Sequence, residues 1–131
     1  MAATFTAAAR HLAPGGAFLF DVWHGPAVLA QRPDIRVKKV VDDKLEVVRT
    51  ARPTLDSDRH TVMVMYHMEC RDRDSGEVRR FTEDHLVRYL FPREIDSLAA
   101  SCGLHVAKSE EFVTGRPPSD ATWGVAYLLR R

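Results

Sequence analysis

The sequence predicts an α/β fold in which a buried strand and its helices are combined with an antiparallel insert. Six of the eight residues at 17–24 are apolar, without alternation, which is typical of a strand buried on both faces. Residues 34–91 instead show alternating apolar positions between short polar turns, which is typical of antiparallel strands. The amphipathic segment 92–103 predicts the clearest helix of the chain.

Residues 1–31 are expected to form a helix, the buried strand and a second, shorter helix. Phe5 and Ala9 recur at helical spacing, and the sequence Pro-Gly-Gly ends the first helix. Gly25-Pro26 follows the strand and opens one or two further helical turns. Because ligands collect beyond the carboxyl ends of strands in open α/β sheets, the end of this strand is a candidate site.

Residues 34–91 are expected to form four antiparallel strands. The longest covers residues 59–71, and its return strand runs from Glu77 to about Phe91. Residues 53–58 are polar and are expected to form a loop before the longest strand.

Residues 92–131 are expected to form a helix followed by two strands. Pro92 opens the helix and Gly103 closes it. The strands are expected at 104–114 and 122–129, with a proline-containing loop between them. No linker separates these parts, so the sequence predicts a single domain of 131 residues.

Composition excludes several classes of function. The net charge of +1 gives no electrostatic reason to expect nucleic acid or an anionic membrane as a partner. No apolar run approaches the roughly 20 residues that a membrane span needs, and no secretory signal is recognised. The two cysteines, Cys70 and Cys102, lack metal-ligand spacing, and we expect a cytoplasmic protein without a metal site.

Four stretches of the chain carry a resemblance to a known family; they are His11–Gly16, Phe18–Ala27, Glu83–Ile95 and Ala99–Leu104. In this order and spacing they resemble the C-terminal half of class I S-adenosylmethionine-dependent methyltransferases, of the small-molecule type with an antiparallel insert. The resemblance implies a partial Rossmann-like sheet. In it residues 17–24 form the fifth strand, and the last strand inserts antiparallel between the fifth and sixth strands.

The resemblance implies methyl transfer to a small-molecule substrate, with this chain supplying the substrate side. In that family a glycine-rich loop after the first strand and an acid after the second strand bind S-adenosylmethionine. Gly15-Gly16 precedes a strand, so its position does not match that loop. We therefore expect no cofactor site in this chain, and no activity of the isolated chain without an N-terminal half.

His24 and Trp23 are the candidate site residues at the end of the buried strand. Imidazole titrates near neutrality, so His24 is a candidate general base, although a surface histidine in a turn is the alternative. Trp23 is a candidate wall of the substrate pocket, with a core indole as the alternative.

The insert contributes the other candidates. Glu83 and His85 share one face of the return strand with Tyr89, so that this face lines a pocket or the pair hydrogen-bonds locally. His85 is a second candidate base, and Glu83 and Tyr89 are candidate substrate contacts. Tyr66 is a substrate contact or a core residue, and Arg49 is a partner for a substrate carboxylate or phosphate or a solvated arginine.

Two other functions remain open at this stage. A non-catalytic remnant module would dimerise or bind a small ligand, because the strand at 17–24 would keep an unpaired edge. We then expect a homo-oligomer that buries residues 18–23. A small α+β cup that binds an apolar ligand is the alternative if the resemblance is set aside.

Overall fold

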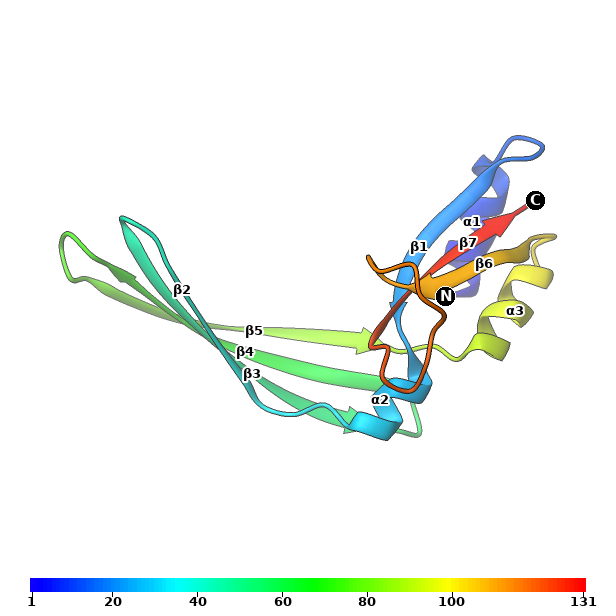
Figure 1. Cartoon of the computed structure of the whole chain (residues 1–131). Helices are drawn as coiled ribbons and strands as arrows, with labels where there is room; N and C mark the ends of the chain where they lie inside the picture. Colours follow the sequence, from blue (N-terminus) through cyan, green and yellow to red (C-terminus); the bar gives the residue numbers. More distant parts are fainter. The chain divides into compact units, whose positions relative to one another are not determined.

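The computed structural model describes residues 1–131, and the chain divides into two compact units (Figure 1). The first unit comprises residues 1–31 and 89–131, and the second comprises residues 32–88. Because the second unit lies within the sequence of the first, it is an insertion between α2 and α3. None of the helices is both long enough and apolar enough to span a membrane.

The first unit is a three-stranded sheet with three helices. Its elements are α1 (Ala2–His11), β1 (Ala17–Trp23), α2 (Gly25–Gln31), α3 (Pro92–Ala100), β6 (His105–Glu111) and β7 (Gly124–Arg130). The strand order is β1-β7-β6, and β7 is antiparallel to both neighbours. The expectation that the last strand inserts antiparallel between the other two is confirmed.

A single apolar core holds the first unit together. Phe5 of α1 packs its ring edge-on against Phe18 and Phe20 of β1, with centroid distances of 6.0 and 5.4 Å. The C-terminal part of the sequence contributes Ile95 from α3 and Leu129 from β7, and both side chains are fully buried in the same core. Short helices of this kind depend on tertiary packing of their apolar face, so α1 is fixed mainly by Phe5.

The expectation that β1 is buried on both faces is wrong for this chain. Phe18 and Phe20 face the core, but Leu19 on the opposite face is 69% exposed. The physical reason is that β1 pairs only with β7, so it is an edge strand, and α1 covers only one of its faces. β1 therefore combines an unalternating apolar sequence with an unpaired outer edge.

The second unit is a four-stranded antiparallel meander. Its strands are β2 (Arg36–Val41), β3 (Leu45–Asp56), β4 (Thr61–Asp72) and β5 (Val78–Arg88), in the order β2-β3-β4-β5. This confirms the expected antiparallel insert. Each hairpin is closed by an aspartate; for example, the carboxylate of Asp72 accepts the backbone N–H groups of Asp74 and Ser75, which lowers its pKa.

The loop expected at residues 53–58 is shorter than the sequence indicates, because β3 continues through Pro53 to Asp56. Pro53 lies opposite Val64 of β4, while β2 pairs with β3 only as far as Ala51. The other edge of β3 therefore has no partner at Pro53. A proline is tolerated in a strand where its missing N–H has no ladder bond to make.

Candidate functional site

The sequence-predicted site residues fall into two groups, one in each unit. Trp23 and His24 lie where β1 ends in the first unit. The four candidates of the second unit lie together on one face of its sheet; they are Arg49, Tyr66, Glu83 and His85.

Backbone hydrogen bonds from two directions fix the position of His24. Its N–H donates to the carbonyl oxygen of Trp123, the residue directly before β7, over 2.9 Å. On the other side Leu90 runs parallel to it, and the N–H of Gly25 donates to the Leu90 carbonyl oxygen over 2.8 Å. The imidazole is therefore carried by a backbone that two other segments of the first unit hold in place.

The side chain of His24 is buried, with 5% exposed, and its Nδ1 atom has no hydrogen-bond partner within the chain. Burial lowers the pKa of His24 from its ordinary value of 6.5, and the negative charge of Asp120 offsets part of that effect. The imidazole is consequently neutral at pH 7. A neutral imidazole with a free ring nitrogen is the form of histidine that can accept a proton.

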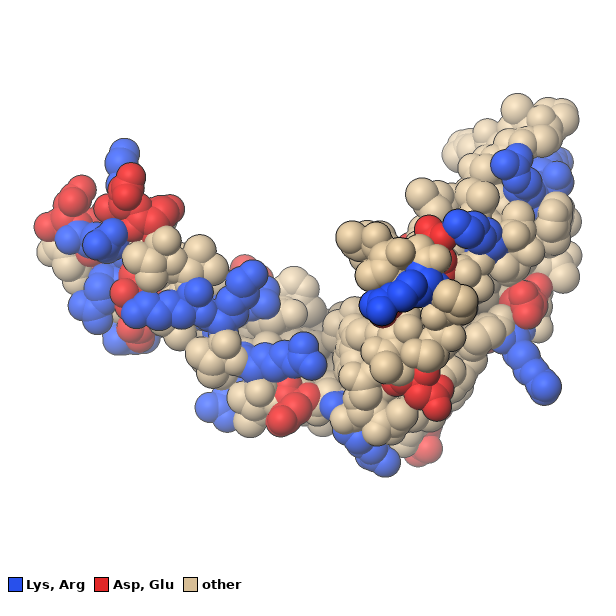
Figure 2. Space-filling view, viewed as in Figure 1, with Lys and Arg blue, Asp and Glu red and all other residues tan.

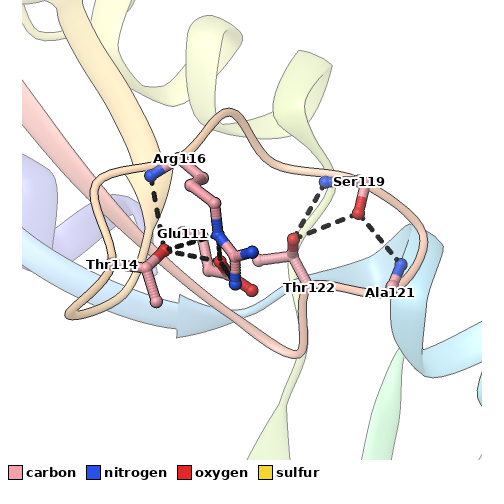
Figure 3. Close-up of polar contacts among 6 residues, drawn as sticks. All are labelled: Glu111, Thr114, Arg116, Ser119, Ala121 and Thr122. Atoms are coloured by element: carbon pink, nitrogen blue, oxygen red, sulfur yellow. Dashed lines mark hydrogen bonds and ion pairs between the residues drawn. The ribbon is translucent and has the colours of Figure 1, made fainter.

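The loop between β6 and β7 carries Asp120 and Trp123, which both act on His24, and it is fixed by its own polar contacts (Figure 3). At one end the hydroxyl of Thr114 donates to the carboxylate of Glu111, and the guanidinium of Arg116 donates to the same carboxylate over 2.9 Å. These contacts lower the pKa of Glu111. At the other end the hydroxyl of Thr122 accepts the N–H of Ser119 over 3.0 Å.

Two residues of this loop complete the first group, and sequence reasoning missed both. The indole of Trp123 packs edge-on against Trp23, with centroids 5.2 Å apart, so Trp23 is half-buried against another indole. Asp120 acts on His24 through its charge, and its carbonyl oxygen accepts a hydrogen bond from Gln31 at the end of α2. The proximity of Pro117-Pro118 to a tryptophan was the available signal for an ordered loop.

The burial of His24 predicts a pH-dependent loss of stability. Above pH 6.5 His24 is neutral in both states; as the pH falls below 6.5, the unfolded chain binds a proton that the folded chain excludes. The free energy of unfolding therefore decreases on acidification, by at most about 1.4 kcal/mol per pH unit from this group. Urea unfolding on both sides of pH 6.5 measures it. His24→Gln should remove this pH dependence of the free energy of unfolding, whereas His105→Gln, at an exposed position of β6, should retain it. The same pH dependence in the unmodified chain and in both variants would contradict the assignment.

In the second unit, the register of β3, β4 and β5 brings the other candidates together. Tyr66 lies directly opposite Glu83, and the Arg49 guanidinium lies over the Tyr66 ring at 5.0 Å from its centroid. The ring of His85 meets Tyr66 edge-on at 5.1 Å, and its Nε2 atom lies 3.1 Å from the Glu83 carboxylate. Glu83 and His85 thus hydrogen-bond locally, one of the two arrangements that the sequence left open.

This group, which we call the tyrosine cluster (Arg49, Tyr66, Glu83 and His85), is open to solvent. Glu83 and His85 are each about half exposed, so neither needs a buried partner. The cluster offers an aromatic face, a cation and a carboxylate side by side. These groups together suit a polar ligand with an amine or several hydroxyls, because such a ligand can stack on the ring and bond the charged groups.

Tyr89 belongs to the first unit, whereas the tyrosine cluster belongs to the second. Its side chain is fully buried, and its ring packs against Phe91 with centroids 5.9 Å apart. A contact between Tyr89 and a substrate stays a prediction.

A shallow hollow of about 510 Å³ lies on the insert, and its lining includes Val48, Thr50, His67, Glu69, Arg80 and Thr82, from the sheet face opposite Tyr66.

The glycines on either side of β1 serve a turn and close packing. Gly25 is the first residue of α2 and follows closely after the end of β1. A Cβ atom at this position would lie 2.8 Å from the Phe91 ring. Gly25 therefore permits close packing against Phe91 instead of opening the backbone to a ligand. Gly15 has a φ of 74° and lies in the turn before β1. The chain contains no group of three or more side chains placed to hold a metal ion.

Solved methyltransferase structures have folds similar to this chain. A S-adenosylmethionine-dependent methyltransferase from Clostridium acetobutylicum matches with a TM-score of 0.74 and 22% identity, over 98% of this chain and 50% of that one. CalS10, an amino pentose methyltransferase from Micromonospora echinaspora, matches with 0.74 and 23%, over 99% and 50%. The sugar N-methyltransferase KedS8 from Streptoalloteichus matches with 0.71 and 24%, over 99% and 49%.

This chain therefore spans about half the length of the solved structures it matches. No protein-family model and no curated protein sequence matches it. At 22 to 24% identity the likeness establishes the fold. The resemblance recognised in the sequence is confirmed at that level: the chain has the mixed α/β fold of the C-terminal half of a class I methyltransferase.

Proposed function

We propose that this chain is the substrate-side half of a S-adenosylmethionine-dependent methyltransferase that acts on a small molecule. The observation that carries the proposal is the coverage: 98 to 99% of this chain superposes on only 49 to 50% of three methyltransferases. The half that binds the methyl donor is then supplied by other polypeptide sequence. The unpaired edge of β1 and the exposed side chain of Leu19 support this, because an additional strand could pair with that edge and bury the leucine.

In this proposal the substrate is a small polar molecule of the amino-sugar kind. CalS10 acts on an amino pentose and KedS8 is a sugar N-methyltransferase. The tyrosine cluster offers matching chemistry, because an aromatic ring stacks on the apolar face of a sugar and Glu83 attracts a protonated amine. Arg49 would hold an anionic group of the same ligand.

His24 is the proposed general base. Methyl transfer depends mainly on the approach of the substrate nucleophile, and a base helps when that nucleophile must lose a proton. The buried, neutral imidazole with an unpaired Nδ1 meets this need. His85 is a second proposed proton acceptor, and its Nε2 atom lies 3.1 Å from the Glu83 carboxylate. Trp23 would form an apolar wall near His24.

A non-catalytic module that dimerises or binds a small ligand is the second candidate function. It is favoured by the tyrosine cluster, which is assembled entirely within the second unit without any methyl-donor site. For either function we propose a cytoplasmic location, which the two free cysteines support.

Two binding measurements test the proposal. The 131-residue chain should show no saturable binding of S-adenosylmethionine by titration calorimetry, because the proposal assigns the donor site to the other half. An amino sugar added to the same chain should shift the NMR signals of Tyr66 and His85, and Glu83→Gln should weaken this binding about tenfold, the loss of one charge-assisted contact. Asp84→Asn, next to it on the opposite face, is the matched control.

Methyl transfer itself has to be tested on a longer polypeptide, in which the sequence encoded upstream in the same reading frame is expressed together with this chain. We call this polypeptide the joined protein. Transfer of a labelled methyl group to an amino sugar is the expected result. Tight binding of S-adenosylmethionine by the isolated chain would contradict the assignment of the donor site to other sequence. Ligand binding by the tyrosine cluster without any methyl transfer by the joined protein would favour the non-catalytic module.

A further inference from the structure

The outer edge of β5 is a long unpaired strand edge. β5 spans 11 residues and ends the order β2-β3-β4-β5, so only its inner side is paired (Figure 1). Its outer N–H and C=O groups can form a ladder with another strand. Acidic and basic side chains are interleaved over the surface of this unit (Figure 2), and charges on an edge strand oppose pairing with any strand of unmatched pattern.

The charges of β5 match a second, antiparallel copy of the same strand. Counting outward from Phe81, Arg79 and Glu83 are at equal distances, and so are Glu77 and His85. In a pair centred on Phe81, Arg79 of each copy faces Glu83 of the other. Glu77, the residue directly before β5, comes opposite His85. Opposite charges directly across an antiparallel pair stabilise it, as do facing aromatic rings.

These side chains lie on one face and are accessible. Residues two apart share a face of a strand, so 79, 81, 83 and 85 all point to the side that carries Tyr66. Phe81 is 46% exposed, and Arg79 is 79% exposed. In the single chain Arg79 pairs with Glu77 at 3.3 Å and His85 with Glu83 at 3.1 Å. Pairing two copies exchanges these partners, and each Arg79 keeps a carboxylate partner.

We propose that β5 joins two copies of this chain edge to edge through a twofold axis at Phe81. The sheet of the second unit then continues from one copy into the next. A twofold pair of this kind is self-complementary and closed, which is the commonest symmetry of protein dimers. Each copy also places its Arg79 beside the partner's Glu83, so that the tyrosine cluster of one copy gains a cation from the other.

Neighbouring registers fit less well. Centring the pair on Arg80 brings Glu77 opposite Glu83, which is a like-charge contact. Centring it on Thr82 gains Arg80 opposite Asp84, but sets Arg79 opposite His85 and Phe81 opposite Glu83. The side-chain pattern therefore selects the register centred on Phe81.

Charge exchange tests the proposal on the full chain by sedimentation velocity at micromolar concentration. The unmodified chain should sediment as a dimer. Arg79→Glu and Glu83→Arg should each weaken the dimer about tenfold or more, because every twofold pair carries the change twice. The double variant with both changes should restore it. Lys38→Glu alters the charge equally on β2, the opposite edge of the sheet, and should leave the dimer unchanged.

A cross-link gives an independent readout of the register. With Cys70 and Cys102 replaced by serine, Phe81→Cys should form a dimer disulfide on oxidation, since residue 81 faces itself, while Leu86→Cys should not. A monomer for the unmodified chain would overturn the proposal. So would a dimer that the single charge changes leave intact, or one lost on Leu19→Lys, which would place the contact on β1. A tighter dimer with Arg79→Glu would indicate the register centred on Thr82.

Discussion

Replacing His24 with glutamine is expected to lower the turnover number for methyl transfer about a hundredfold or more in the joined enzyme, because a positioned general base contributes at least that much. Glutamine can bond through its amide but cannot take up the proton that the substrate nucleophile releases. The Michaelis constant should change little, since the base acts in the transition state. Initial rates with a labelled methyl donor, measured against pH, separate the two parameters.

The pH profile distinguishes this role from a structural one. The acidic limb of kcat/KM should follow the lowered pKa of His24 and disappear in His24→Gln. His11→Gln, which removes an exposed imidazole at the end of α1, is the matched control and should keep the full profile. If His24→Gln raised only the Michaelis constant, or kept the acidic limb, His24 would be a positioning residue and not the base.

The sequence predicted the order and type of the elements well because most are specified locally. α2 begins at Gly25 and α3 at Pro92, as the turn residues indicated. The meander follows from alternation and from aspartates at its turns. The prediction that failed is the burial of β1 on both faces. An apolar run shows that a strand can be buried, but its actual exposure depends on the strands and helices that pack against it, and β1 pairs with one strand only.

The two groups of site residues were predictable to different degrees. Glu83 and His85 are two residues apart in one strand, so their contact follows from strand geometry alone. The position of Tyr66 opposite Glu83 depends on the register of β4 and β5, which the hairpin length sets. Trp123 and Asp120 come to His24 from about a hundred residues further along the chain, and no local pattern reports such a contact.

Phe5→Ala is expected to lower the free energy of unfolding of this chain by about 3–5 kcal/mol, the usual cost of removing a fully buried aromatic ring. Phe5 is 1% exposed and contacts both Phe18 and Phe20, so the substitution leaves a cavity between α1 and β1. Urea unfolding followed by circular dichroism measures the change. A loss below about 1 kcal/mol would show that α1 does not depend on this contact.

Leu19→Ala, one position along the strand from the two phenylalanines, is the matched comparison. In the isolated chain the Leu19 side chain is largely exposed, and its removal should change stability by less than about 0.5 kcal/mol. In the joined protein the same change should cost about 2–5 kcal/mol, because the neighbour of β1 would bury the leucine. Equal effects in both proteins would mean that nothing covers this face. The difference therefore measures, on a single side chain, whether β1 is an outer edge or an inner strand of a larger sheet.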